Sequence, residues 1–161
     1  MYRRIMLTLD GSELSRSAIP QAIALVQGSS TEVVVFQAID TVAALRNRFI
    51  GESFEFTGGR PEAIAELAES QHFMQRDRAH EELEAAAEQL RAVGAAVTTE
   101  VGEGVPGNAI LDAADRHDVD AIVMATRGHG GLGRDVVGSV AEYVLRHAGN
   151  RALILAGSRS G

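Results

Sequence analysis

Short apolar runs recur along the chain at intervals typical of strands separated by helices. The runs are 3–9 (RRIMLTL), 32–39 (EVVVFQAI), 95–101 (AAVTTEV), 120–125 (DAIVMA) and 151–156 (RALILA). The second and fourth are almost continuously apolar, which is typical of strands covered on both faces in a parallel sheet. The third alternates more and carries Thr98, Thr99 and Glu100, which predicts an edge strand.

Helical patterns occur in all four gaps between these runs, at 12–28, 60–94, 106–118 and 138–149. Pro61 and Pro106 lie near the starts of two of them, where proline is tolerated, and Gly94 is a candidate C-terminal cap. Pro20 falls inside the first pattern, so it marks either a late helix start or a kink.

The alternation of strands and helices predicts one domain over 1–161, an α/β fold with an open, mostly parallel sheet. The exception is 40–60, which holds three of the five phenylalanines and which we interpret as an irregular connection. It is either a partly disordered linker or a lid or partner surface.

Composition excludes several classes of function. The net charge of -7 and the low aromatic content, 4% with no tryptophan, argue against nucleic-acid and anionic-membrane partners. All fifteen basic residues are arginine, which excludes a Walker A lysine, and without cysteine there is no disulfide or thiolate metal site. The five histidines show no metal-ligand spacing. The short apolar start and the lack of an 18-residue apolar run predict a cytoplasmic protein.

The stretch 125–139, ATRGHGGLGRDVVGS, is rich in glycine and lies between a predicted strand and a predicted helix. Backbone N–H groups at such a junction, together with the helix dipole, favour an anion, and Arg127, His129 and Arg134 add positive charge. Residues 128–133 match G-x-G-x-x-G, but a dinucleotide fingerprint belongs to an early βαβ unit with an acidic residue about 20 positions on. Only one strand follows here, which disfavours a dinucleotide site.

The chain resembles the universal stress protein family over nearly its whole length. The resemblance is carried by 5–26 (IMLTLDGSELSRSAIPQAIALV), 104–111 (GVPGNAIL), 118–148 and 152–155 (ALIL). Nucleotide-binding members carry G-x2-G-x9-G-[ST]. Gly128, Gly138 and Ser139 match this motif, whereas Ala125 replaces its first glycine, and alanine disfavours a positive φ.

The resemblance implies a five-stranded parallel sheet of order 3-2-1-4-5 with helices on both faces, like that of adenine nucleotide alpha hydrolases. It also implies an adenine-nucleotide site in the crevice between the first and fourth strands, with ATP, AMP or cyclic AMP as ligand. The residues implied are Thr8, Leu9, Asp10, Ser12, Ala38, Met124, Ala125, Thr126, Arg127, Gly128, His129, Gly138, Ser139 and Val140.

Within this implied site, Gly128 and Ser139 would approach the phosphates, Asp10 the ribose or adenine, and Ala38 the adenine through its backbone. Asp10 could also hold Mg²⁺ with the phosphates. The structural alternatives are a plain helix N-cap at Gly138–Ser139, a capped turn at Asp10–Ser12, and a solvated loop histidine at His129.

The resemblance favours a stress-response regulator that binds nucleotide without fast turnover. The alternatives are an interaction module of the same fold that binds no nucleotide, which Ala125 favours, and a slow ATP hydrolase. The run 151–156 would be a bare apolar edge strand, which predicts a homodimer formed by pairing this strand with its copy.

Overall fold

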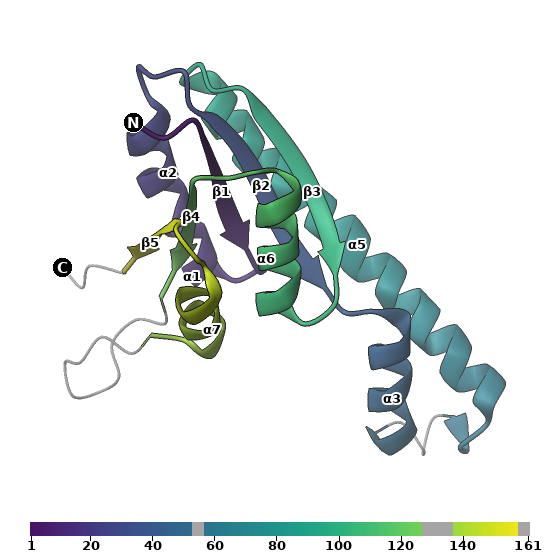
Figure 1. Cartoon of the computed structure of the whole chain (residues 1–161). Helices are drawn as coiled ribbons and strands as arrows, with labels where there is room; N and C mark the ends of the chain where they lie inside the picture. Colours follow the sequence, from purple (N-terminus) through teal and green to yellow (C-terminus); the bar gives the residue numbers. More distant parts are fainter. Residues whose placement is uncertain (53–56, 127–136, 158–161) are drawn as a thin grey trace.

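The computed structural model describes residues 1–52, 57–126 and 137–157, and shows one five-stranded parallel sheet with helices on both faces (Figure 1). The strand order β3-β2-β1-β4-β5 is the predicted one. The elements in chain order are β1 Arg4–Leu9, α1 Glu13–Arg16, α2 Ile19–Val26, β2 Glu32–Ile39, α3 Val42–Glu52, α5 Pro61–Ala92, β3 Val97–Glu103, α6 Pro106–Arg116, β4 Ala121–Ala125, α7 Ser139–His147 and β5 Ala152–Ala156.

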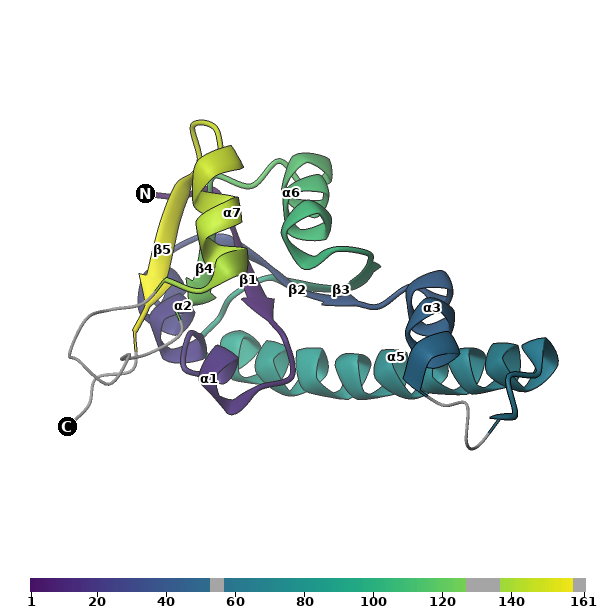
Figure 2. The same ribbon diagram turned by 90° about the horizontal axis from the view of Figure 1, so that it is seen from below.

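The central strands are buried on both faces because successive side chains point to opposite sides of a strand. On β1, Ile5 and Leu7 belong to the core under α2 and α5, and Met6 belongs to the core under α6 and α7. Figure 2 shows these two helical layers on either side of the sheet. The continuous apolar runs of β1, β2 and β4 therefore reflect a three-layer architecture.

Proline positions explain how the helices begin. Pro20 lies in the first turn of α2, which confirms a late helix start, and the residues before it form the separate short helix α1. Pro61 and Pro106 likewise occupy the first helical turns of α5 and α6. Proline fits there because the first N–H groups of a helix have no partner within the helix.

The prediction that 40–60 is irregular was wrong for most of this segment, because α3 occupies Val42–Glu52. The Thr41 hydroxyl accepts a hydrogen bond from the Ala44 N–H at 3.1 Å, and Leu45 is fully buried. Figure 2 shows α3 packed against the N-terminal half of α5, beyond the sheet. The apolar face of α3 is covered by another helix, α5, and the weak periodicity of 42–52 alone did not reveal the helix.

Within the described residues, none of the helices is long and apolar enough to cross a membrane.

Asp120 connects the beginnings of β1 and β4. Its Oδ2 atom accepts hydrogen bonds from the backbone N–H groups of Arg3 at 2.7 Å and Arg4 at 3.0 Å. These bonds, chiefly the one from Arg4, lower the pKa of Asp120 below its ordinary value of 3.8, because they stabilise the ionised carboxylate.

The lowered pKa predicts an acid-dependent loss of stability. A carboxylate with a lower pKa in the folded state stabilises the fold above the unfolded pKa, and this stabilisation is lost as the pH falls through the folded pKa. We expect Asp120→Asn to be less stable than the wild type at pH 7 and the difference to shrink below about pH 4. Urea unfolding at both pH values measures this, and an equal difference at both would contradict it.

Candidate functional site

A cavity of about 350 Å³ opens at the carboxyl ends of β1 and β4. The first three strands extend the sheet to one side of β1 and the last two extend it to the other side, so β1 and β4 flank the topological switch point. Ligands of open α/β sheets bind at this position. Its lining includes predicted residues from all parts of the chain: Thr8, Leu9, Asp10, Ser12, Ala38, Met124, Ala125, Gly138, Ser139 and Val140.

The remaining predicted residues fall into two groups. Thr126 is buried and does not line the cavity; its N–H donates to the Ala156 carbonyl at 3.1 Å and extends the pairing of β4 with β5. Arg127, Gly128 and His129 lie outside the described residues.

Sequence reasoning missed five residues that also line the cavity: Leu14, Ser15, Pro106, Ile110 and Ala141. Pro106 and Ile110 belong to the run GVPGNAIL, which carried part of the family resemblance and could have pointed to this wall. Leu14, Ser15 and Ala141 lie on helices that follow predicted site residues. Whether they line the cavity depends on the direction in which each helix leaves the site, which the sequence did not give.

The end of β1 makes a tight turn into the cavity. Gly11 has a φ of 86°, a conformation that glycine adopts without steric cost. The Asp10 Oδ1 atom accepts a hydrogen bond from the Ser12 N–H at 2.8 Å, and the Ser12 hydroxyl oxygen accepts one from the Ser15 N–H at 3.0 Å. The predicted capped turn is thus present, and it also holds the Asp10 carboxylate at the rim of the cavity.

The opposite rim is the N-terminus of α7. Gly138 is its N-cap residue in an extended conformation and makes no side-chain cap within the described structure. The first N–H groups of a helix lack partners within the helix and carry its positive dipole end, so they attract anions. Ser139 adds an exposed hydroxyl at this position. This end of the cavity suits a phosphate.

Between these rims the lining is mainly apolar. Leu9, Ile110 and Met124 are buried side chains, and Val140 is partly buried. An apolar interior with a few polar groups at its edges is usual for small-molecule sites.

Ala125 causes no backbone strain here. It is the last residue of β4, paired with Ala156, and Asp118 alone among the described non-glycine residues has a positive φ. The position matching the first motif glycine is therefore extended in this chain. Alanine at position 125, which favoured the nucleotide-free interaction module, therefore causes no backbone strain in this fold.

Helices α6 and α7, which form one wall of the cavity, are joined by Tyr143. Its hydroxyl donates a hydrogen bond to the Asn108 Oδ1 atom, and its ring stacks on His147 with 4.3 Å between ring centroids. Gly107 lies directly under this ring, since a Cβ atom there would stand 2.4 Å from Tyr143 Cδ1. The missing side chain lets the two helices approach.

We expect Gly107→Ala to destabilise the protein by about 1–3 kcal/mol, because the tyrosine ring has to move. In a Tyr143→Ala background the same change should be neutral or stabilising, since alanine favours a helix over glycine by up to about 1 kcal/mol. Denaturant unfolding of the four proteins measures the coupling, and equal effects of Gly107→Ala in both backgrounds would contradict the contact.

Within the described residues, the structure forms no group of three histidine, aspartate or glutamate side chains that could hold a metal ion. Asp10 is a single carboxylate at the cavity rim, so Mg²⁺ bound together with phosphates stays a prediction.

The parallel sheet and the cavity at its switch point define a doubly wound α/β protein. The model of the universal stress protein family matches residues 1–155, and the chain belongs to this family. It is 34% identical over 157 residues to a universal stress protein of Synechocystis, covering 96% of this chain and 97% of that relative.

Solved structures share the fold. MJ0577, a universal stress protein of Methanocaldococcus jannaschii, superposes with a TM-score of 0.75 at 23% identity, covering 100% of this chain and 99% of that one. A family member from Arabidopsis thaliana with AMP bound has a TM-score of 0.62 at 13% identity, covering 98% and 92% of the two chains. A universal stress protein in complex with cAMP has a TM-score of 0.59 at 19% identity, covering 98% of each chain.

Proposed function

We propose that this universal stress protein binds an adenine nucleotide, with ATP as the favoured ligand, in the cavity between β1 and β4. The observation that carries the proposal is the arrangement of this cavity: an apolar interior, the Asp10 carboxylate at one rim and the N-terminus of α7 at the other. A purine fits the apolar part, ribose hydroxyls can donate to a carboxylate, and phosphates suit helix N–H groups. The AMP and cAMP complexes of two proteins with this fold support the same ligand class.

Isothermal titration of the full chain with ATP, AMP, cAMP and GTP, each with and without Mg²⁺, tests the proposal. We expect saturable binding of at least one adenine nucleotide and weaker binding of GTP. Absence of both heat and thermal shift at millimolar concentrations would leave the nucleotide-free interaction module as the function.

We propose that the protein acts as a stress-response regulator through binding and not through fast turnover. Ser12 and Ser15, the hydroxyl residues near Asp10, are engaged in capping the turn. The chain also has no lysine to clamp the phosphates. Phosphate release from ATP should therefore be slow, and rapid release by the purified protein would make it an ATP hydrolase. A cytoplasmic location stays a prediction.

We propose a homodimer through β5, the edge strand after β4. Ala152–Leu155 is only partly buried in the single chain, and an apolar edge is covered when it pairs with a copy of itself. Light scattering should give the mass of two chains, and a monomer at micromolar concentration would contradict this.

A further inference from the structure

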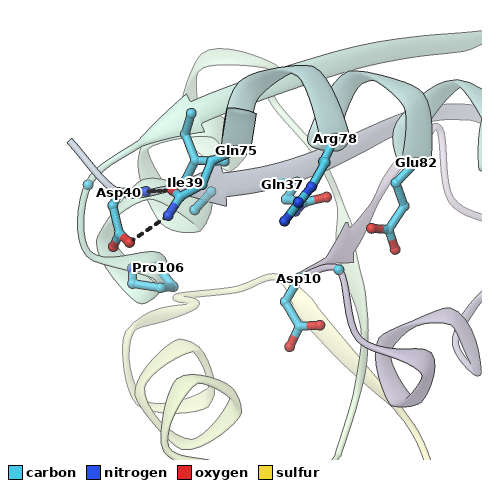
Figure 3. A pocket seen from close by; sticks show the side chains of 11 residues that line it. Asp10, Gln37, Ile39, Asp40, Gln75, Arg78, Glu82 and Pro106 are labelled. Carbon is cyan, nitrogen blue, oxygen red and sulfur yellow. Dashed lines mark hydrogen bonds between the residues drawn. The ribbon is translucent and has the colours of Figure 1, made fainter. Parts of the chain in front are cut away.

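A second cavity, of about 450 Å³, lies at the ends of β1 and β2 on the face of the sheet covered by α5 (Figure 3). Asp10, Ala38 and Pro106 line both cavities, so the two are adjacent. The proposed nucleotide site does not account for the side chains that enter this second cavity from β2 and α5. Its volume is within the range of roughly 300–1,000 Å³ that is usual for small-ligand sites.

Gln37, on β2, lines this cavity and is only 8% exposed. Its Oε1 atom has no hydrogen-bond partner in the described structure. This oxygen atom is itself fully buried, so in the present orientation it does not reach the cavity, and the amide atom near the cavity is Nε2, which lies 3.7 Å from the point where a Cβ would stand on Gly11. Turning the terminal amide, whose last torsion is broad and roughly two-fold, brings either its oxygen or its nitrogen to the cavity.

Glu82 and Gln37 converge over the bare Cα atom of Gly11. The point where a Cβ would stand on Gly11 lies 3.6 Å from Glu82 Oε2 and 3.7 Å from Gln37 Nε2. The side chain of Glu82 is only 15% exposed, and its ion pair with Arg16 is long, at 3.5 Å. Burial raises the pKa of Glu82, so a cation entering the cavity would stabilise its ionised form.

Arg78 lies one helical turn before Glu82 on α5, and Figure 3 shows both side chains extending from α5 toward the cavity. Opposite charges four residues apart on a helix can pair, yet these two do not, and Arg78 has no hydrogen bond or ion pair with any described residue. The cavity is thus lined by a positive side chain, Arg78, and a negative side chain, Glu82, that do not pair with each other.

Asp40, which follows β2, and Gln75, on α5, also line this cavity and are already engaged with each other. The Asp40 carboxylate accepts from Gln75 Nε2 at 3.1 Å and from Arg48 at 3.3 Å, and Gln75 Oε1 accepts from the Asp40 N–H at 3.1 Å. On β2 and α5, the groups that can still bind a ligand in the cavity are Gln37, Glu82 and Arg78, and the Asp10 carboxylate after β1 lines the same cavity.

We propose that this cavity binds a small zwitterion of the amino-acid class. The ligand ammonium group would donate to the Gln37 carbonyl and the Glu82 carboxylate, and the ligand carboxylate would accept from the Arg78 guanidinium. Glu82 would repel a ligand that carries only a negative charge, and Arg78 would repel a ligand that carries only a positive charge. Each of these ligands would therefore bind less tightly than a zwitterion. Gln37, Arg78 and Glu82 do not line the neighbouring cavity, although Asp10 and Ala38, which the nucleotide proposal uses, line both cavities.

The test is titration of the full chain with the L-α-amino acids, β-alanine and γ-aminobutyrate, followed by calorimetry and thermal shift. Butyrate and butylamine are the matched controls, because each keeps the chain of γ-aminobutyrate but only one of its charges. We expect saturable binding of at least one zwitterion, and binding of both controls to be at least about tenfold weaker.

Three variants locate the binding. Arg78→Ala and Glu82→Gln should each weaken the zwitterion at least about tenfold, whereas Arg91→Ala, which removes an exposed arginine of α5 outside the cavity, should not. The proposal is overturned if no probe binds, if butylamine binds as well as the zwitterions, or if both cavity variants bind normally.

Ser139→Glu separates this proposal from the nucleotide proposal. Because it changes only the first cavity, it should lose ATP and keep the zwitterion. If Arg78→Ala instead weakens ATP and leaves the zwitterion unaffected, the second cavity is part of the nucleotide site and the zwitterion proposal is wrong.

Discussion

Ser139→Glu is expected to lower the affinity for ATP by at least about 100-fold while leaving the fold intact. Ser139 is the first residue of α7, is exposed, and lines the rim proposed to hold the phosphates. A glutamate there brings a negative charge against the phosphates and competes for the same N–H groups. The same charge favours the helix itself, since acidic side chains stabilise a helix N-terminus.

Two controls make this result specific. Ser139→Ala removes only the hydroxyl and should weaken ATP about tenfold or less. Ala43→Glu adds the same charge to the exposed first turn of α3, away from the cavity, and should leave ATP binding unchanged. Normal ATP binding by Ser139→Glu, with unchanged thermal stability, would contradict a phosphate position at α7.

The largest expected effect on stability is that of Phe36→Ala, which should cost about 3–5 kcal/mol of unfolding free energy. Phe36 is fully buried on β2, in the core beneath α6 and α7. Its ring covers Gly102 on the neighbouring strand β3, where a Cβ atom would stand 2.6 Å from Phe36 Cζ. The ring fills the space that a side chain at position 102 would occupy.

This contact predicts a coupled pair of substitutions. Gly102→Ala alone should cost about 1–3 kcal/mol, because the confined ring has to move, and less in a Phe36→Leu background. Gly51→Ala is the matched control, since Gly51 lies in α3 with open space where a Cβ atom would stand, and it should be stabilising by up to about 1 kcal/mol. Denaturant unfolding at one fixed protein concentration measures all variants, and no coupling between positions 36 and 102 would contradict the packing.

Many positions around the first cavity could be predicted because they follow from two local signals. Residues at the carboxyl end of a parallel strand, such as Asp10 and Met124, necessarily reach the sheet edge where ligands bind. Residues that begin a helix after a glycine-rich stretch, such as Ser139, necessarily present backbone N–H groups. Their assembly around one cavity required the strand order that the family resemblance implied.

The wall formed by α6 could not be predicted in this way. Pro106 was identified as a helix start, but its place at the cavity depends on how closely α6 packs against α7. That distance is set by Gly107 beneath Tyr143, two residues far apart in the sequence. The same limit applies to Gln37, Arg78 and Glu82, which lie in a predicted strand and a predicted helix whose patterns gave no sign of a shared cavity.

The sequence by itself determined the alternation of strands and helices, the helix starts at its prolines, and the burial of β2 and β4 on both faces. These follow from hydrophobic periodicity and local backbone chemistry, which act over a few neighbouring residues. Only the tertiary structure decided that 42–52 is a helix, that Ala125 is extended, and that α5 turns polar groups toward a second cavity. Each of these depends on packing or pairing between separate segments of the chain, which the local pattern of one segment does not record.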